Sequence, residues 1–126
     1  MFSGFKVAII DDEKDIRDSI SQWLSLSGYE TQVFSDAESA LTSITTGYPG
    51  IVITDIKMPG MSGMGLLKRL MWMDSTLPIV LITGHGDVAM AVEAMHLGAY
   101  DFLEKPFEPD IISPVSYTHL TLPTKA

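Results

Sequence analysis

IVITDIKMPG, residues 51–60, decides the fold. Its first four residues are all β-branched and show no polar alternation, which is typical of a strand covered on both faces. Pro59-Gly60 then indicates a turn. Four large apolar residues recur at helical spacing beyond that turn: Leu66, Leu67, Leu70 and Met71. The segment therefore predicts a buried strand, a turn and a helix in succession, which is the repeating unit of an α/β sheet.

The same alternation extends in both directions along the chain. Further strands are expected at residues 6–10, 31–34, 78–83 and 99–103. The first helix is expected from Asp12-Glu13 to Gly28, the second starts at a capping box formed by Ser35 and Glu38, and the fourth ends at Gly98. Strict alternation with right-handed crossovers predicts an α/β fold. We expect a doubly wound, five-stranded parallel sheet with the flavodoxin-like order 2-1-3-4-5.

Composition limits the class of protein. The chain has 126 residues, 46% apolar and 19% charged, which is enough for one globular domain. No apolar run approaches the roughly 18 residues of a membrane span, and the first residues lack the layout of a signal peptide. The absence of cysteine excludes thiolate sites and fits a cytoplasmic protein. A net charge of -8 without a basic cluster argues against direct binding to nucleic acid.

The C-terminal segment departs from the alternation. A fifth helix is expected near residue 112, but residues 113–126 contain two prolines and several serine and threonine residues with no helical period. We therefore predict a domain at residues 1–112 whose fifth helix is truncated or replaced, and a non-native-looking or disordered tail at residues 113–126. Without that helix, apolar sheet surface would be exposed, and such a surface tends to bind a partner, so a homodimer or oligomer is expected.

Polar residues follow the expected strands at their carboxyl ends. These residues are Asp11, Asp12, Asp55, Thr83 and Lys105. Each has an ordinary explanation alone: a helix cap, a turn residue or a surface lysine. However, the carboxyl ends of parallel strands meet at one edge of the sheet, where ligands bind. The residues are therefore expected to form one site.

Three carboxylates at one site would repel one another and raise one another's pKa. A divalent cation relieves that conflict, and ligands that are all oxygen select a hard ion such as Mg²⁺. The ammonium of Lys105 and the hydroxyl of Thr83 suit the oxygens of a transferred phosphoryl group. The carboxylate of Asp55 can be the attacking group, which would form an aspartyl phosphate.

These motifs together resemble a response-regulator receiver domain. The resemblance covers residues 5–112 and rests on Asp11-Asp12, residues 55–63, Thr83-Gly84 and Lys105-Pro106-Phe107. Residues 83–107 are most similar to receivers of the sigma-54-dependent activators, especially the C4-dicarboxylate transport regulators. The resemblance implies a phosphorylation-dependent switch of a two-component system that controls an output domain, with transcription as its target. Such a protein is not an enzyme, apart from catalysing its own phosphorylation and dephosphorylation.

The resemblance also implies a role for each residue. Asp55 would accept the phosphoryl group from a sensor histidine kinase or a small acyl phosphate. Asp11, Asp12, Asp55 and the backbone carbonyl of Lys57 would hold Mg²⁺. Lys105, followed by a cis bond to Pro106, would pair with the phosphoryl oxygens. Thr83 would move toward them and let Phe102 change between exposed and buried positions.

Two other functions stay open from the sequence. Residues 84–89, GHGDVA, match the G-x-G-x-x-A pattern of dinucleotide sites between a strand and a helix, which would suit a small nucleotide- or flavin-binding module. An interaction domain that is never phosphorylated is the second alternative. Lys57 and His85 flank the site, where they either regulate attack by water or are solvated loop residues.

Overall fold

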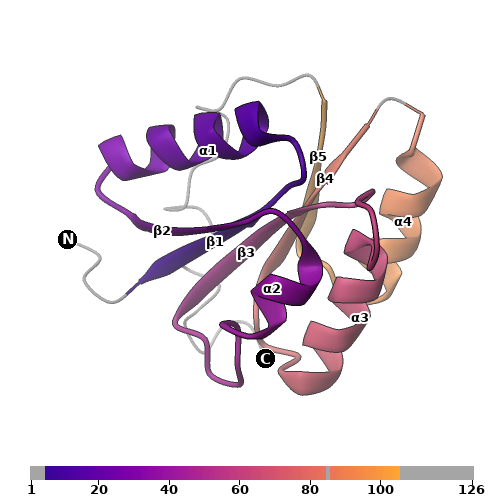
Figure 1. Cartoon of the computed structure of the whole chain (residues 1–126). Helices are drawn as coiled ribbons and strands as arrows, with labels where there is room; N and C mark the ends of the chain where they lie inside the picture. Colours follow the sequence, from indigo (N-terminus) through magenta and orange to yellow (C-terminus); the bar gives the residue numbers. More distant parts are fainter. Residues whose placement is uncertain (1–4, 85, 106–126) are drawn as a thin grey trace.

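One parallel sheet organises the molecule (Figure 1). The computed structural model describes residues 5–84 and 86–105, in which five strands are ordered β2-β1-β3-β4-β5. The strands are β1 (Lys6–Ile10), β2 (Glu30–Phe34), β3 (Gly50–Asp55), β4 (Ile79–Thr83) and β5 (Asp101–Glu104). The helices are α1 (Lys14–Leu26), α2 (Ala37–Leu41), α3 (Gly63–Met73) and α4 (Val88–His96). The predicted fold class and strand order are confirmed.

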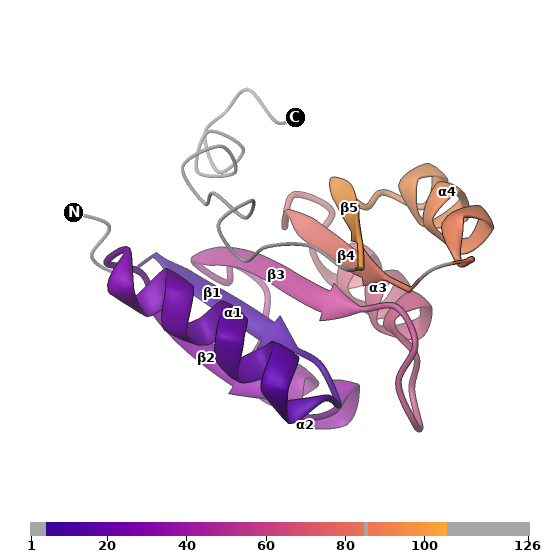
Figure 2. The ribbon, with the colours of Figure 1, turned by 90° about the horizontal axis from the view of Figure 1, so that it is seen from above.

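Helices lie on both faces of the sheet, with α1 on the near side of β1 and β2 in Figure 2, and an apolar core lies on each face. On one face, Ile20 and Leu24 of α1 pack with alternate residues of the central strands, such as Ile9 and Ile53. On the other face, α2, α3 and α4 contribute Ala40, Leu66, Leu67, Leu70 and Ala94. Every residue of β3 and β4 is buried, as their uninterrupted apolar sequences predicted. The central strands are thus held from both sides.

A close approach between β3 and α3 fixes the start of that helix. A Cβ atom on Gly63 would lie 2.1 Å from the backbone oxygen of Asp55, so only glycine fits there. The Gly63 N–H donates to the Ile56 oxygen at 2.9 Å, and the Ser62 side chain accepts from the Gly65 N–H and caps the helix. The end of β3 is therefore packed directly against α3.

Several element boundaries differ from the prediction. The cap of α2 is Asp36, whose side chain accepts from the Ser39 N–H, so the Ser35 capping box was wrong. β5 begins at Asp101 rather than residue 99, because the Ala99 N–H still bonds to the Ala94 oxygen at the end of α4. These differences move boundaries and leave the topology unchanged.

Several predictions fall outside the described residues: the truncated fifth helix, the tail at residues 113–126 and the bond between Lys105 and Pro106. Among the described residues, every helix falls short of the length and apolar character needed to cross a membrane.

Candidate functional site

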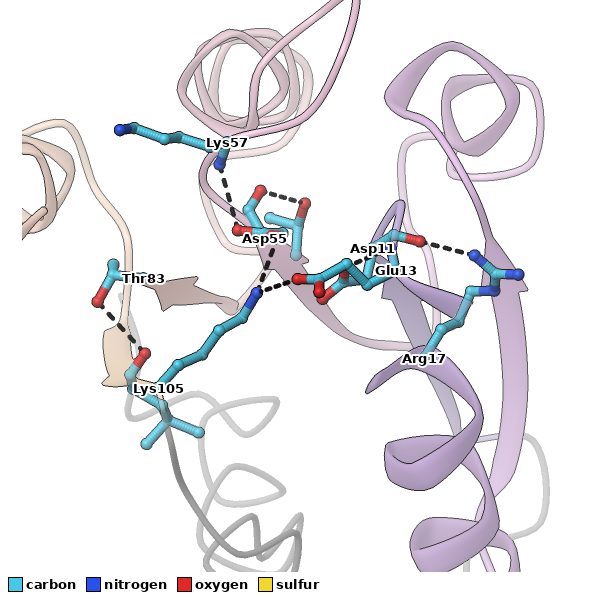
Figure 3. Close-up of polar contacts among 9 residues, drawn as sticks. Asp11, Glu13, Arg17, Asp55, Lys57, Thr83 and Lys105 are labelled. Carbon is cyan, nitrogen blue, oxygen red and sulfur yellow. Dashed lines mark hydrogen bonds and ion pairs between the residues drawn. The ribbon is translucent and has the colours of Figure 1, made fainter. Parts of the chain in front are cut away.

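The predicted site residues meet at one edge of the sheet (Figure 3). Asp11 follows β1, Asp55 ends β3, and Thr83 ends β4. Lys105 follows β5, and its N–H donates to the Thr83 oxygen at 2.8 Å, which continues the ladder between β4 and β5. Parallel pairing aligns these strand ends, so residues far apart in sequence become neighbours.

Three carboxylates form the acidic part of the site. One oxygen each from Asp11, Asp12 and Asp55 lies within 4.8 Å of the others. Asp11 and Asp55 are buried, whereas Asp12 is exposed. The Oδ1 atom of Asp11 accepts from the Glu13 N–H at 2.8 Å, but its buried Oδ2 has no hydrogen-bond partner in the described part of the chain. A buried, unpaired carboxylate oxygen beside other carboxylates is unfavourable, and a hard cation would compensate for it.

Burial is the main influence on the Asp11 carboxyl group. Desolvation raises its pKa from 3.8 to about 6. The hydrogen bond from the Glu13 N–H opposes this rise, while the nearby charge of Asp55 adds to it. The protein thus holds Asp11 in an environment that disfavours its charged form when no cation is present.

Lys105 places an ammonium group beside the carboxylates of the site. Its Nζ lies 2.9 Å from Glu13 Oε1 and 3.2 Å from Asp55 Oδ2, and its side chain is 22% exposed. Burial acts to lower its pKa, but the hydrogen bond with Glu13 and the charges of Asp55 and Asp11 outweigh burial, so the pKa is raised. The interpretation of Lys105 as a solvated surface lysine is therefore wrong.

Thr83 does not cap the helix that follows it. It is fully buried, and its hydroxyl donates to the Leu103 oxygen at 3.4 Å, which is long for a hydrogen bond. Asp87 occupies the cap position of α4 instead. Phe102 is half-buried against the core beneath α2, α3 and α4. Thr83 and Phe102 lie on the neighbouring strands β4 and β5, with Phe102 opposite Leu81 of β4.

The backbone of Lys57 contacts the site, whereas its side chain extends away from it. Its N–H donates to Asp55 Oδ1 at 3.2 Å. Its side chain points away from Asp55 (Figure 3). The ammonium pairs with Asp87 Oδ1 at 3.0 Å. The loop after β3 is thereby joined to the loop after β4. His85, the other flanking residue in the prediction, lies outside the described residues.

Four contact residues were missed by sequence reasoning. Glu13 binds Lys105, Asp87 binds Lys57, the Arg17 guanidinium donates to the Asp11 backbone oxygen at 2.8 Å, and Glu38 accepts from the Met61 N–H at 3.2 Å. Only Glu13 carried a usable signal, because it directly follows the acidic pair at the end of β1.

Comparison with known proteins gives one consistent result. The model of the response regulator receiver domain family matches residues 7–114. The chain is 46% identical over 110 residues to the C4-dicarboxylate transport transcriptional regulatory protein DctD of Rhizobium meliloti. It is 47% identical over 104 residues to the transcriptional regulatory protein FixJ of Bradyrhizobium diazoefficiens. The match to DctD agrees with the similarity to C4-dicarboxylate transport regulators that was predicted from residues 83–107.

Solved structures of response regulators have the same fold as this chain. Full-length FixJ from B. japonicum superposes with a TM-score of 0.83 at 41% identity, covering 96% of this chain and 61% of that one. The receiver domain of NtrX from Brucella abortus gives a TM-score of 0.78 at 38% identity, covering 91% of this chain and 98% of that one.

The coverage of the relatives is unequal. The alignments take in 87% of this chain but 24% of DctD, and 82% of this chain but 51% of FixJ. The chain thus corresponds to a fraction of each regulator.

Proposed function

This chain belongs to the response regulator receiver domain family, the phosphorylation switches of two-component systems, and from that premise we propose that Asp55 is its phosphoacceptor. The contact between Lys105 Nζ and Asp55 Oδ2, at 3.2 Å, carries the proposal. It places a cation beside the carboxylate oxygen that would attack, and close to where the phosphoryl charge would arrive.

In the proposed reaction, a carboxylate oxygen of Asp55 attacks the phosphorus atom of the donor. A new O–P bond forms while the donor's P–N bond, in a phosphohistidine, or P–O bond, in an acyl phosphate, breaks. The bonding electrons leave with the donor. Lys105 stabilises the charge on the transferred oxygens, and the Lys57 N–H, which donates to Asp55 Oδ1, holds the carboxylate in place.

The acidic residues fit Mg²⁺. Asp11, Asp12, Asp55 and the backbone carbonyl of Lys57 would hold the ion, which when bound offsets the negative charge of the site and of the donor. The unpaired buried Oδ2 of Asp11 and the three neighbouring carboxylates support this assignment. Asp12 is exposed, and one of its carboxylate oxygens lies within 4.8 Å of oxygens of Asp11 and Asp55.

The response would pass through Thr83 and Phe102. The Thr83 hydroxyl makes a 3.4 Å hydrogen bond with the Leu103 oxygen, so a phosphoryl oxygen would be a stronger acceptor. Movement of Thr83 would change the space available to Phe102, which is half-buried on the adjacent strand. Phenylalanine has no hydroxyl, so this readout depends on burial of the ring alone.

A sensor histidine kinase is the proposed donor, and transcription is the proposed output, as the names of DctD and FixJ suggest. Direct binding of this chain to nucleic acid remains disfavoured by its charge of -8. Cytoplasmic location stays a prediction from the sequence.

A dimer is supported by an exposed apolar row on α4, formed by Val88, Val92 and Met95. Sedimentation of the wild type and of Val92→Lys tests it, and identical monomeric profiles would contradict it.

Nucleotide binding at residues 84–89 is disfavoured by Asp87. Its Oδ2 would lie 3.1 Å from a Cβ placed on Gly84, and its N–H already donates to the Gly84 oxygen. A phosphate at this turn would meet a carboxylate where it needs a donor. The interaction domain without phosphorylation is disfavoured by the assembled acceptor, acidic cluster and lysine.

The deciding experiment is the intact mass of the protein after incubation with acetyl phosphate and Mg²⁺. We expect a gain of one phosphoryl group in the wild type and none in Asp55→Asn. Equal labelling of both proteins, or no labelling of the wild type, would refute the assignment.

A further inference from the structure

Among the described residues, the carboxylate nearest to Lys105 is that of Glu13, a residue outside the proposed acceptor and cation ligands. The distance from Lys105 Nζ is 2.9 Å to Glu13 Oε1 but 3.2 Å to Asp55 Oδ2. The two residues are 92 positions apart, so the fold has to bring them together. Figure 3 shows the lysine side chain extending between the two carboxylates.

Building on the proposed role of Asp55, we propose that Glu13 is a positioning residue that holds the Lys105 ammonium in the unphosphorylated state and releases it when the phosphoryl group arrives. A phosphoryl group brings a charge of roughly -1.5 to -2 and three strong acceptor oxygens. Those oxygens compete with Glu13 for the same ammonium. Glu13 therefore stabilises the resting state relative to the phosphorylated one.

The exposure of the two partners supports a releasable contact. The Glu13 side chain is 58% exposed, whereas that of Lys105 is 22% exposed and that of Asp55 is 7% exposed. An exposed carboxylate regains hydration when its partner leaves, so release costs little. A buried carboxylate in the same place would hold the lysine much more firmly.

The Glu13 backbone has a separate task, which allows the side chain to be tested alone. Its N–H donates to Asp11 Oδ1 at 2.8 Å and orients that carboxylate. Glu13→Gln keeps this N–H and nearly the same side-chain volume but removes the charge. The proposed cation ligands are therefore left in place, and only the competition for Lys105 changes.

The first test measures the equilibrium affinity for beryllofluoride, a phosphoryl mimic, at fixed Mg²⁺ by ¹⁹F NMR. We expect Glu13→Gln to bind roughly two- to fivefold more tightly than the wild type, which is the range for a partly exposed ion pair. Asp15→Asn, which removes one charge from the exposed first turn of α1, is the matched control and should match the wild type. Equal affinities of Glu13→Gln and the wild type, or an equal gain in Asp15→Asn, would overturn the proposal.

The second test asks whether Glu13 acts through Lys105. In a Lys105→Met background, Glu13→Gln should leave the mimic affinity unchanged, and a persisting gain would show a general charge effect and refute the proposal.

Brief reductive methylation without Mg²⁺ gives a readout independent of binding. Lys105 should be modified faster in Glu13→Gln than in the wild type, with Lys14 and Lys57 unchanged, and equal rates would refute the tether. A wild type that is phosphorylated while all variants behave alike refutes only this inference, whereas an unmodified wild type refutes the role of Asp55.

Discussion

Asp11→Asn is expected to stabilise the metal-free protein at neutral pH. Burial holds the pKa of the Asp11 carboxyl at about 6 in the folded state, against an ordinary value of 3.8. Folding therefore penalises the charged carboxylate. Asparagine keeps an oxygen to accept from the Glu13 N–H, and its amide N–H group can donate to the neighbouring carboxylates. The substitution thus removes the charge without removing the hydrogen bond.

The magnitude follows from the pKa. A rise from 3.8 to about 6 corresponds to roughly 3 kcal/mol, at about 1.4 kcal/mol for each pH unit. Because the folded protein retains the proton to higher pH than the unfolded chain, stability falls as pH rises through this window. The advantage of Asp11→Asn should be about 1–3 kcal/mol above pH 7, shrink below pH 6 and vanish near pH 4.

Urea unfolding in EDTA, followed by circular dichroism from pH 4 to pH 8, measures this difference directly. Asp18→Asn is a control of opposite sign, since the Asp18 pKa is lowered by its hydrogen bond with Lys14. Adding Mg²⁺ should stabilise the wild type more than Asp11→Asn, because an ion held at the proposed site stabilises the folded state and the variant lacks one of its carboxylate ligands. A variant that is less stable than the wild type in EDTA at pH 7.5, or a gain independent of pH, would refute the reasoning.

Three further predictions concern the loops around the site. Gly63→Ala should cost about 2–4 kcal/mol in urea unfolding, because its Cβ would meet the Asp55 backbone oxygen. A Cβ at Gly65 would approach the flexible Met61 side chain at 3.0 Å and the Ser62 Oγ atom at 3.7 Å, so Gly65→Ala should cost less than about 1 kcal/mol, and equal costs would contradict this packing. Lys57→Ala and Asp87→Ala should change the phosphoryl lifetime in the same direction and by similar factors, since each breaks the same ion pair, and a change in only one would assign the effect to that residue alone. The Phe102 ring should change environment in ¹³C-resolved NMR spectra when beryllofluoride is added, and an unchanged ring would exclude it from the response.

Much of the fold was predictable because its signals are local. Strands buried on both faces have uninterrupted apolar sequences, as in residues 51–54, and alternation with helices then restricts the topology. Boundaries were less predictable, because neighbouring polar residues compete for the same backbone donors. Asp36 rather than Ser35 caps α2, and the bond from the Ala99 N–H to the Ala94 oxygen delays β5.

The site was predictable as a set of positions and not as a set of contacts. Strand ends in a parallel sheet converge, so Asp11, Asp55, Thr83 and Lys105 were expected together. The partners of the long side chains depend on distances between loops that no local pattern encodes. The pairing of Lys57 with Asp87 and the contact between Lys105 and Glu13 both belong to this class.

The burial of the strands has a mechanical consequence. Asp55 ends β3, a central strand that is buried throughout, while Lys105 follows β5, an outer strand with three half-buried residues and one exposed residue. A new charge at Asp55 would therefore act between β3, which is rigidly packed, and β5, which is less firmly packed. Displacement should concentrate on the compliant side, so hydrogen exchange in β5 should respond to phosphorylation more than exchange in β3. The attraction between a phosphoryl group on Asp55 and the Lys105 ammonium acts equally on both residues, but the resulting movement would be confined to β5.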